Sequence, residues 1–180
     1  SRLDEADMKP VDIHSGIEST LLILQHKLKK NGDGAGIQVI KEYSELPKVN
    51  CYASGLNQVF MNILSNAIDA VELEVGLKEA TAKLENPLSP IFERKIEIRT
   101  EVCDKNLVRI SIANNGPGMT EEVRSRVFDP FFTTKAVGKG TGLGLSISYQ
   151  IVVEKHGGKL MCISTPDQGT EFAIEIPVRR

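Results

Sequence analysis

The sequence has 180 residues, of which 41% are hydrophobic and 26% charged, and its formal net charge at pH 7 is −2. This composition is typical of a globular protein that buries one core, in one domain or in one domain with a short appendage. The balanced charge argues against a nucleic-acid-binding surface, and the sequence contains neither an apolar run of 18 residues nor a signal peptide.

The cysteines form no recognisable disulfide or metal pattern. Cys51, Cys103 and Cys162 are odd in number and far apart, without a CxxC pair, and the three histidines are equally scattered. We therefore expect free thiols in a reducing, cytoplasmic compartment. The chain begins with Ser-Arg-Leu, which favours a piece of a longer protein, and whether that parent is membrane-anchored is left open.

The N-terminal part predicts a helix followed by a strand. Residues 1–9 are polar and are expected to be the tail of an upstream helix, which Pro10 stops. Apolar residues at helical spacing predict a second helix within 14–30. A glycine-containing loop over 32–36 separates it from residues 37–43, IQVIKEY, which predict a strand.

The clearest helical pattern lies in residues 55–74. Its apolar positions follow the i, i+3, i+4, i+7 rule: Leu56, Val59, Phe60, Ile63, Leu64, Ala67, Ile68 and Val71. Residues 75–94 have little periodicity and contain Pro87 and Pro90, so we interpret them as an insert, part helix and part loop. A tolerated surface insertion explains it better than a contact with another domain.

Strands dominate the second half of the chain. Residues 95–102 and 107–114 alternate between apolar and polar side chains and are joined by a short turn at 104–106, so they predict a hairpin. Residues 120–128 predict a short helix with Thr120 as its N-cap.

The chain then returns to one helix and a final pair of strands. A helix is predicted over 142–158, ended by Gly157 and Gly158, and two strands over 159–164 and 170–178. The fold class is therefore α+β, with one mostly antiparallel sheet covered by helices on one face.

Three polar side chains share one face of the long predicted helix. At about 100° per residue, Asn62, Asn66 and Asp69 lie within roughly 60° of one another, opposite the apolar stripe. A solvated polar face is the simplest interpretation, but asparagine is a poor helix former. A carboxamide oxygen is a suitable ligand for Mg²⁺, which also keeps waters and phosphate oxygens.

Two glycine-containing segments predict close backbone approach. The first is NNGPGM (114–119), directly after a strand, which by itself indicates a plain turn. The second is GKGTGLGL (138–145), where bare amides before a helix N-terminus form an anion site and Lys135 and Lys139 add positive charge. Its spacing matches neither a Walker A loop nor a G-x-G-x-x-G loop.

Three phenylalanines precede the second glycine segment. Phe131 and Phe132 are interpreted as a hydrophobic contact that seats one end of a mobile lid, whereas ordinary core packing explains Phe128 better. The segment therefore predicts a phosphate-binding loop with an apolar base.

Taken in order, these motifs resemble the catalytic, ATP-binding domain of bacterial sensor histidine kinases, a GHKL-type domain related to those of DNA gyrase, MutL and a heat-shock chaperone. NQVFMNILSNAIDA (57–70) resembles the N box, and NNGPG (114–118) the G1 box. FDPFFTTK (128–135) resembles the F box, GKGTGLGL (138–145) the G2 box, and GTEFAIEIP (169–177) the closing strand.

The resemblance implies a Bergerat-type α/β sandwich in which ATP lies between the long helix and a flexible lid. It implies Asn66 as the Mg²⁺ ligand, and Asn62 and Lys135 as residues that take part in catalysis. The residues implied to bind the nucleotide are Asn62, Asn66, Asp69, Asn114, Gly116, Gly118, Phe132, Thr134, Lys135, Gly140, Thr141, Gly142, Leu143, Gly144, Leu145 and Thr170.

The residue at position 62 bears on the reaction. Hydrolysing relatives commonly carry a glutamate there, whereas Asn62 cannot take a proton from water. The resemblance therefore implies transfer of the γ-phosphoryl group to a histidine on a separate helical domain. Residues 1–13 would be the tail of that domain and its linker, and 14–180 the catalytic domain. The parent would form a homodimer through the absent domain and pass the phosphoryl group to a response regulator.

Asn114 departs from the family pattern. The family normally has an aspartate there, which accepts a hydrogen bond from the adenine amino group. A charged hydrogen bond contributes about 1.5–3 kcal/mol and a neutral one about 0.5–1.5, so the loss is about 1 kcal/mol, or about five-fold in affinity. The alternatives are a degenerate nucleotide-binding or interaction module, an ATPase of the gyrase or MutL type, and an anti-sigma-type serine kinase.

Overall fold

The computed structural model describes residues 7–29, 36–85, 92–134 and 142–179. Most of the loop expected at 32–36 and the residues 135–141 of the expected lid lie outside the described residues. In the part of the chain that is described, no helix combines the length and the apolarity needed to cross a membrane.

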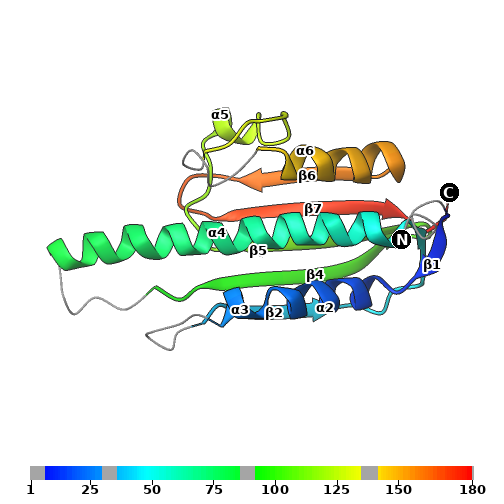
Figure 1. The fold of residues 1–180 in the computed structure, drawn as a ribbon, viewed down its shortest axis with the longest axis horizontal. Helices are drawn as coiled ribbons and strands as arrows, with labels where there is room; N and C mark the ends of the chain where they lie inside the picture. Colours follow the sequence, from blue (N-terminus) through cyan, green and yellow to red (C-terminus); the bar gives the residue numbers. More distant parts are fainter. Residues whose placement is uncertain (1–6, 30–35, 86–91, 135–141, 180) are drawn as a thin grey trace.

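A five-stranded mixed sheet forms the base of the domain (Figure 1). Its spatial order is β2 (Gln38–Tyr43), β4 (Lys95–Asp104), β5 (Leu107–Asn114), β7 (Thr170–Pro177) and β6 (Lys159–Ser164). β2 and β4 are parallel, and the other three neighbouring pairs are antiparallel. The predicted α+β class, the mostly antiparallel mixed sheet and the hairpin between β4 and β5 are confirmed.

A second, two-stranded sheet was missed by the sequence analysis. β1 (Lys9–Val11) pairs antiparallel with β3 (Val49–Cys51). The expected helical tail is therefore wrong at its end, because Lys9 and Pro10 are extended, and residues 1–6 lie outside the described part. Both strands of a two-stranded sheet are edge strands. Proline, which has no backbone N–H to donate, is tolerated in such a strand.

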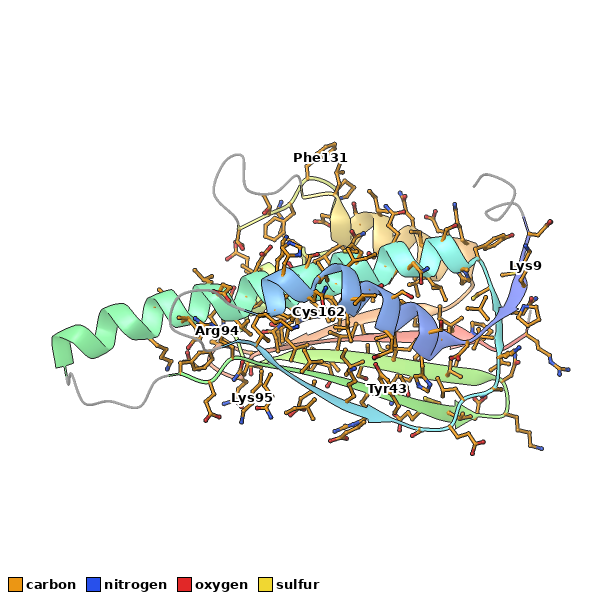
Figure 2. The ribbon with its side chains drawn as sticks, turned by 60° about the horizontal axis from the view of Figure 1, so that its bottom comes forward. Lys9, Tyr43, Arg94, Lys95, Phe131 and Cys162 are labelled. Carbon is orange, nitrogen blue, oxygen red and sulfur yellow. The ribbon has the colours of Figure 1, made fainter. Side chains whose placement is uncertain are left out.

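The helices lie on one face of the five-stranded sheet (Figures 1 and 2). α2 (Ile13–Ile23) begins at Asp12, whose carboxylate accepts hydrogen bonds from the amides of His14 and Ser15, and α3 (Gln25–Leu28) follows it. α2 packs on the long helix α4 (Ala53–Glu85). Together these helices cover the isoleucines of the central strands, among them Ile96, Ile98, Ile110, Ile112 and Ile174.

α4 continues further than the sequence predicted. It ends at Glu85, so the first part of the expected insert is helical, whereas residues 86–91 lie outside the described part. The helix runs past the end of the sheet (Figure 1), where it has no core to cover, and Leu77 is 52% exposed. The apolar periodicity is lost there, although alanine, leucine, lysine and glutamate still favour helix.

The remaining helices flank the far edge of the sheet. α5 (Glu121–Arg124) is shorter than predicted, and the hydroxyl of Thr120 caps it by accepting from the amide of Val123. The single helix predicted over 142–158 is α6 (Gly144–Tyr149) followed by a π-helix, η1 (Gln150–Lys155).

The opposite face of the sheet carries charged side chains. Arg99 pairs with Glu42 at 3.0 Å, and Arg109 bonds to both Glu101 and Glu175. No described helix packs on this face. The helices that carry the candidate site residues, α4 and α6, therefore lie on the other face.

Candidate functional site

A cavity of about 270 Å³ lies between α4, the segment 119–134 and the start of α6. Its volume is near the lower bound of typical ligand pockets. It is lined by Asn62, Ser65, Asn66, Met119, Val123, Val127, Phe132, Thr133, Thr134, Gly142, Gly144 and Leu145. Seven of these are residues that the sequence analysis assigned to the nucleotide: Asn62, Asn66, Phe132, Thr134, Gly142, Gly144 and Leu145.

α4 supplies the polar wall of the cavity. Asn62, Ser65 and Asn66 lie on one face of the helix, half-buried, whereas Ile63 and Ala67 point into the core. This arrangement follows from the helical repeat, since residues three and four apart share a face. The predicted pairing of two carboxamides at one site is therefore present.

The side chain of Asn62 is fixed by α6. Its Nδ2 donates to the carbonyl oxygen of Gly144 at 3.0 Å and to the hydroxyl of Ser148 at 3.2 Å. The polar wall of α4 is thus joined directly to the first turn of the helix that follows the glycine segment.

Gly142, on the wall opposite α4, has a backbone conformation that requires glycine. Its φ is +73°, and a Cβ at this position would stand 2.4 Å from the carbonyl carbon of Phe131. The amide of Phe131 donates to the carbonyl oxygen of Gly142 at 2.9 Å. Close backbone approach, which the glycine density predicted, is confirmed here.

The other side of the cavity is apolar. Met119, Val123, Val127 and Leu145 line it, and this mixture of one polar and one apolar wall suits a ligand with a flat apolar part and a charged part. Phe132 also lines the cavity, with the guanidinium of Arg126 4.6 Å from the centre of its ring.

Phe128 and Phe131 differ in burial: the first packs in the core and the second lies on the surface. Phe128 packs against Tyr149 and Phe172, with ring centroids 5.4 and 6.2 Å away, so its interpretation as core packing is confirmed. Phe131 instead is 73% exposed and has a φ of +67°, and it points away from the sheet (Figure 2).

The described lining of the cavity contains no ionisable side chain. Asparagine, serine, threonine, methionine, phenylalanine, valine, leucine and glycine make up the whole described set. None of them can act as a general base at neutral pH without a further activating group. The described residues can thus orient a ligand and donate or accept hydrogen bonds, but they cannot deprotonate a water molecule.

Asn114 is buried at the end of β5 and is engaged locally. Its Oδ1 accepts a hydrogen bond from the amide of Gly116 at 2.9 Å. A Cβ on Gly116 would stand 2.8 Å from the carbonyl oxygen of Ala70, so the turn presses against α4. Asn115 fixes the turn from the other side by accepting from the amide of Lys95.

Asn114 and Gly116 line a second cavity, of about 540 Å³, rather than the first. Charged residues from α4, β4 and the turn between β6 and β7 complete its lining, among them Glu74, Lys78 and Asp167. The predicted contact of Asn114 with a base stays a prediction.

Several other predicted residues lie outside the first cavity. Asp69 is exposed, and Leu143 immediately precedes α6. Gly118 has a φ of +75°, and Thr170 is buried, with its hydroxyl 2.8 Å from that of Ser164. Their contacts with a nucleotide stay predictions. Lys135, Gly138, Lys139, Gly140 and Thr141 lie outside the described residues.

The sequence analysis missed five lining residues: Ser65, Met119, Val123, Val127 and Thr133. Ser65 could have been found, because it lies three residues after Asn62 on the same helical face. The valines could not, since their spacing in a short helix is equally typical of core residues.

Comparison with known proteins decides the family. The model of the histidine kinase-, DNA gyrase B- and HSP90-like ATPases matches residues 51–180, which is more than half of the chain and contains both walls of the cavity. The chain belongs to this ATPase family.

Its relatives within the family are histidine kinases. Sporulation kinase E of Bacillus subtilis (strain 168) is 37% identical over 136 residues, which cover 76% of this chain. The signal transduction histidine-protein kinase AtoS of Escherichia coli (strain K12) is 32% identical over 179 residues, which cover 99% of this chain. The chain spans 15% and 25% of the lengths of these two proteins.

Solved structures agree with this family assignment. The nucleotide-free catalytic domain of the histidine kinase ThkA superposes with a TM-score of 0.74 and 28% identity, over 97% of this chain and 99% of that one. A structure of ThkA in complex with the response regulator TrrA matches with a TM-score of 0.69, over 95% of this chain and 42% of the kinase. The fold of this ATPase-family chain is therefore that of a histidine kinase catalytic domain.

Proposed function

We propose that the chain is the ATP- and Mg²⁺-binding catalytic domain of a sensor histidine kinase. In the longer parent protein it donates the γ-phosphoryl group of ATP to a histidine on a separate helical domain. The chain spans a quarter or less of the two kinases compared above, and the acceptor histidine is proposed to belong to another part of the parent.

One observation carries the proposal: the described lining of the first cavity has no ionisable side chain. A hydrolysing ATPase needs a group that activates water, and the amide of Asn62 cannot do so because a carboxamide is not a base at neutral pH. A site that orients a phosphoryl group and supplies no base suits transfer to a nucleophile brought by another domain.

The residues present fit ATP with Mg²⁺. The glycine backbone at 142–144 and the half-buried carboxamides suit phosphate and metal, and the apolar wall suits a base. Asn66 is the proposed Mg²⁺ ligand, because a neutral amide oxygen suits an ion that keeps waters and phosphate oxygens. When bound, the metal supplies positive charge to the phosphate oxygens. Lys135 is the proposed cation at the γ-phosphate.

The proposed partner of the site is the parent's own dimeric phosphoacceptor domain. The exposed ring of Phe131 lies beside the cavity, because Phe132 next to it and Gly142 bonded to it both line the cavity that an incoming nucleophile has to reach. Exposed aromatic rings are typical anchors of protein interfaces. A response regulator is the proposed second partner, by similarity to ThkA and its complex with TrrA.

The proposed location is the cytoplasm. ATP is abundant there, and Cys51, Cys103 and Cys162 are all free thiols, which a reducing compartment preserves.

Asn114 favours a second candidate, a degenerate module without kinase activity. If its Oδ1 remained committed to the amide of Gly116, its Nδ2 would meet the adenine amino group, donor to donor. Adenine would then bind weakly or not at all, and the domain would act through protein contacts.

Calorimetric titration of the chain with ATP and Mg²⁺, beside Asn114→Asp, separates the two candidates. Binding by both proteins, several-fold tighter in the variant, supports the kinase domain, because a carboxylate offers a second oxygen as acceptor. Binding by the variant alone would favour the degenerate module. Absence of binding by either protein would overturn both nucleotide-binding readings.

A further inference from the structure

Asn62 joins the two helices that carry the walls of the first cavity. It stands on α4, and the nitrogen of its side-chain amide donates to two acceptors on α6. The two acceptors are only 2.9 Å from each other, so the amide nitrogen meets both on the same side. The remaining atom, Oδ1, is the acceptor that the side chain can offer to the cavity.

Ser148 closes the connection. Its side chain is fully buried, and its hydroxyl accepts from Asn62 and donates to the carbonyl oxygen of Gly144 at 2.9 Å. Asn62, Gly144 and Ser148 thus form a closed triangle of three hydrogen bonds. Each bond supports the geometry of the other two, because a displaced Asn62 leaves a buried hydroxyl with an unfilled acceptor position.

The triangle lies between the two parts of the site. On α4, Asn66 is one helical turn after Asn62 and lines the same cavity. On the other side, Gly144 is the first residue of α6, and Gly142 and Leu145 beside it also line the cavity. A shift of α6 along α4 would therefore change the distance from Asn66 to the backbone amides at the start of α6.

We propose that Asn62 is a positioning residue, which fixes the start of α6 relative to Asn66 and so holds the phosphate-binding and metal-binding parts of the site in register. This inference rests on the proposed function, since it concerns the same site. It differs from a direct role, in which Asn62 itself contacts the metal or the phosphates.

The geometry also explains why a carboxylate does not suit this position. In Asn62→Asp an oxygen without a proton would stand where Nδ2 now lies, 3.0 Å from the carbonyl oxygen of Gly144. Two acceptors at that distance repel each other, so α6 would move away. A protonated aspartic acid has one O–H donor and restores one of the two bonds.

The first measurement is the affinity for ADP by calorimetry, with Mg²⁺ and separately with EDTA. We expect Asn62→Ala to bind ADP about ten-fold more weakly in both conditions, the equivalent of about 1.4 kcal/mol. Asn57→Ala is the matched control, because Asn57 is exposed on the same helix and lines neither cavity. An ADP affinity of Asn62→Ala equal to that of the wild-type chain in both conditions would overturn the proposal, and Ser148→Ala then separates lost register from a direct contact of Asn62 with the metal.

Ser148→Ala tests the connection from the other helix. Ser148 lines neither cavity, so it can affect ADP only through the triangle. We expect it to weaken ADP binding, and the double variant with Asn62→Ala to lose much less than the product of the two single losses. Normal ADP binding by Ser148→Ala, or losses that multiply, would contradict a shared positioning role.

The pH dependence of Asn62→Asp gives a readout that loss of packing cannot reproduce. The new carboxyl would be half-buried and would face the carbonyl oxygen of Gly144, which raises its pKa above the ordinary value of about 3.9. Relative to the wild-type chain, its ADP affinity should therefore recover as the pH falls from 7.5 to 4.5 and the carboxyl gains its proton. A constant ratio across this range would overturn the role of the donor. If the wild-type chain itself does not bind ADP, the proposed function fails; if it binds and the variants bind equally, the positioning role fails alone.

Discussion

The amide of Phe131 donates to the carbonyl oxygen of Gly142 at 2.9 Å, and both residues have a positive φ, +67° and +73°. The bond holds the segment that follows α5 against the residues just before α6, at the edge of the first cavity. Phe132 and Thr134, which follow Phe131, line the cavity together with Gly142. The backbone contact between Phe131 and Gly142 therefore helps to set the shape of this wall of the cavity.

Gly142→Ala should abolish this contact without unfolding the domain. The new Cβ would stand 2.4 Å from the carbonyl carbon of Phe131, in a conformation that L-residues rarely adopt. We expect ATP affinity to fall more than ten-fold by calorimetry, an effect of at least about 1.4 kcal/mol.

Gly76→Ala is the control for that substitution. Gly76 is inside α4, and a Cβ there meets nothing within 4 Å. The variant should keep the ATP affinity and gain about 0.5–1 kcal/mol of stability in urea unfolding, since alanine favours helix. Unchanged ATP binding by Gly142→Ala would show that the contact with Phe131 is not needed for the site.

The sequence predicted those parts of the site whose geometry depends on local spacing or on the residue type at one position. Asn62 and Asn66 share a helical face by period, and Gly142 supplies a backbone conformation that few residues can adopt. The same reasoning could not show that Asn62 bonds to Gly144 and Ser148, because 82 and 86 residues separate the partners along the chain.

The fold was predictable to a similar depth. The sequence predicted all five strands of the main sheet, two of them by alternation, whereas β1 and β3, three residues each, are too short to show alternation. The end of α4 was missed because hydrophobic periodicity reports a covered face, and α4 leaves the sheet before it ends. The parallel pairing of β2 with β4 depends on contacts that no local pattern encodes.

His156 should contribute strongly to stability. It is buried, its Nε2 accepts from the amide of Tyr52 at 3.1 Å, and its Nδ1 lies 2.8 Å from the carbonyl oxygen of Ile151. His156→Leu leaves a buried amide without this acceptor, which costs about 2–4 kcal/mol of unfolding free energy in urea titration. The exposed His26→Ala should change it by less than about 0.5 kcal/mol. Equal effects of the two substitutions would refute the structural role of His156.

The three thiols should react at very different rates. Burial raises the pKa of Cys51 and of Cys162 to about 11, whereas Cys103 is exposed on β4. At pH 8 a thiol with a pKa of about 11 is roughly one part in a thousand thiolate, the reactive form. Iodoacetamide should therefore modify Cys103 first in the native chain, with all three modified in urea. Early native labelling of Cys51 or Cys162, read by peptide mass spectrometry, would contradict the burial of these thiols.

Phe131→Asn should separate nucleotide binding from phosphoryl transfer. Asparagine tolerates a positive φ, so the backbone contact with Gly142 can persist while the exposed ring is removed. We expect ATP affinity to stay within about two-fold of the wild-type value. In the full-length parent, labelling of the acceptor histidine by ATP should slow about ten-fold, since an exposed aromatic anchor typically contributes more than 1 kcal/mol at an interface. Leu77→Asn is the control, because Leu77 is also exposed but belongs to α4 and lines neither cavity. Equal labelling rates for wild type and Phe131→Asn would remove this ring from the proposed interface, and a parallel loss of ATP affinity would assign it to the nucleotide site instead.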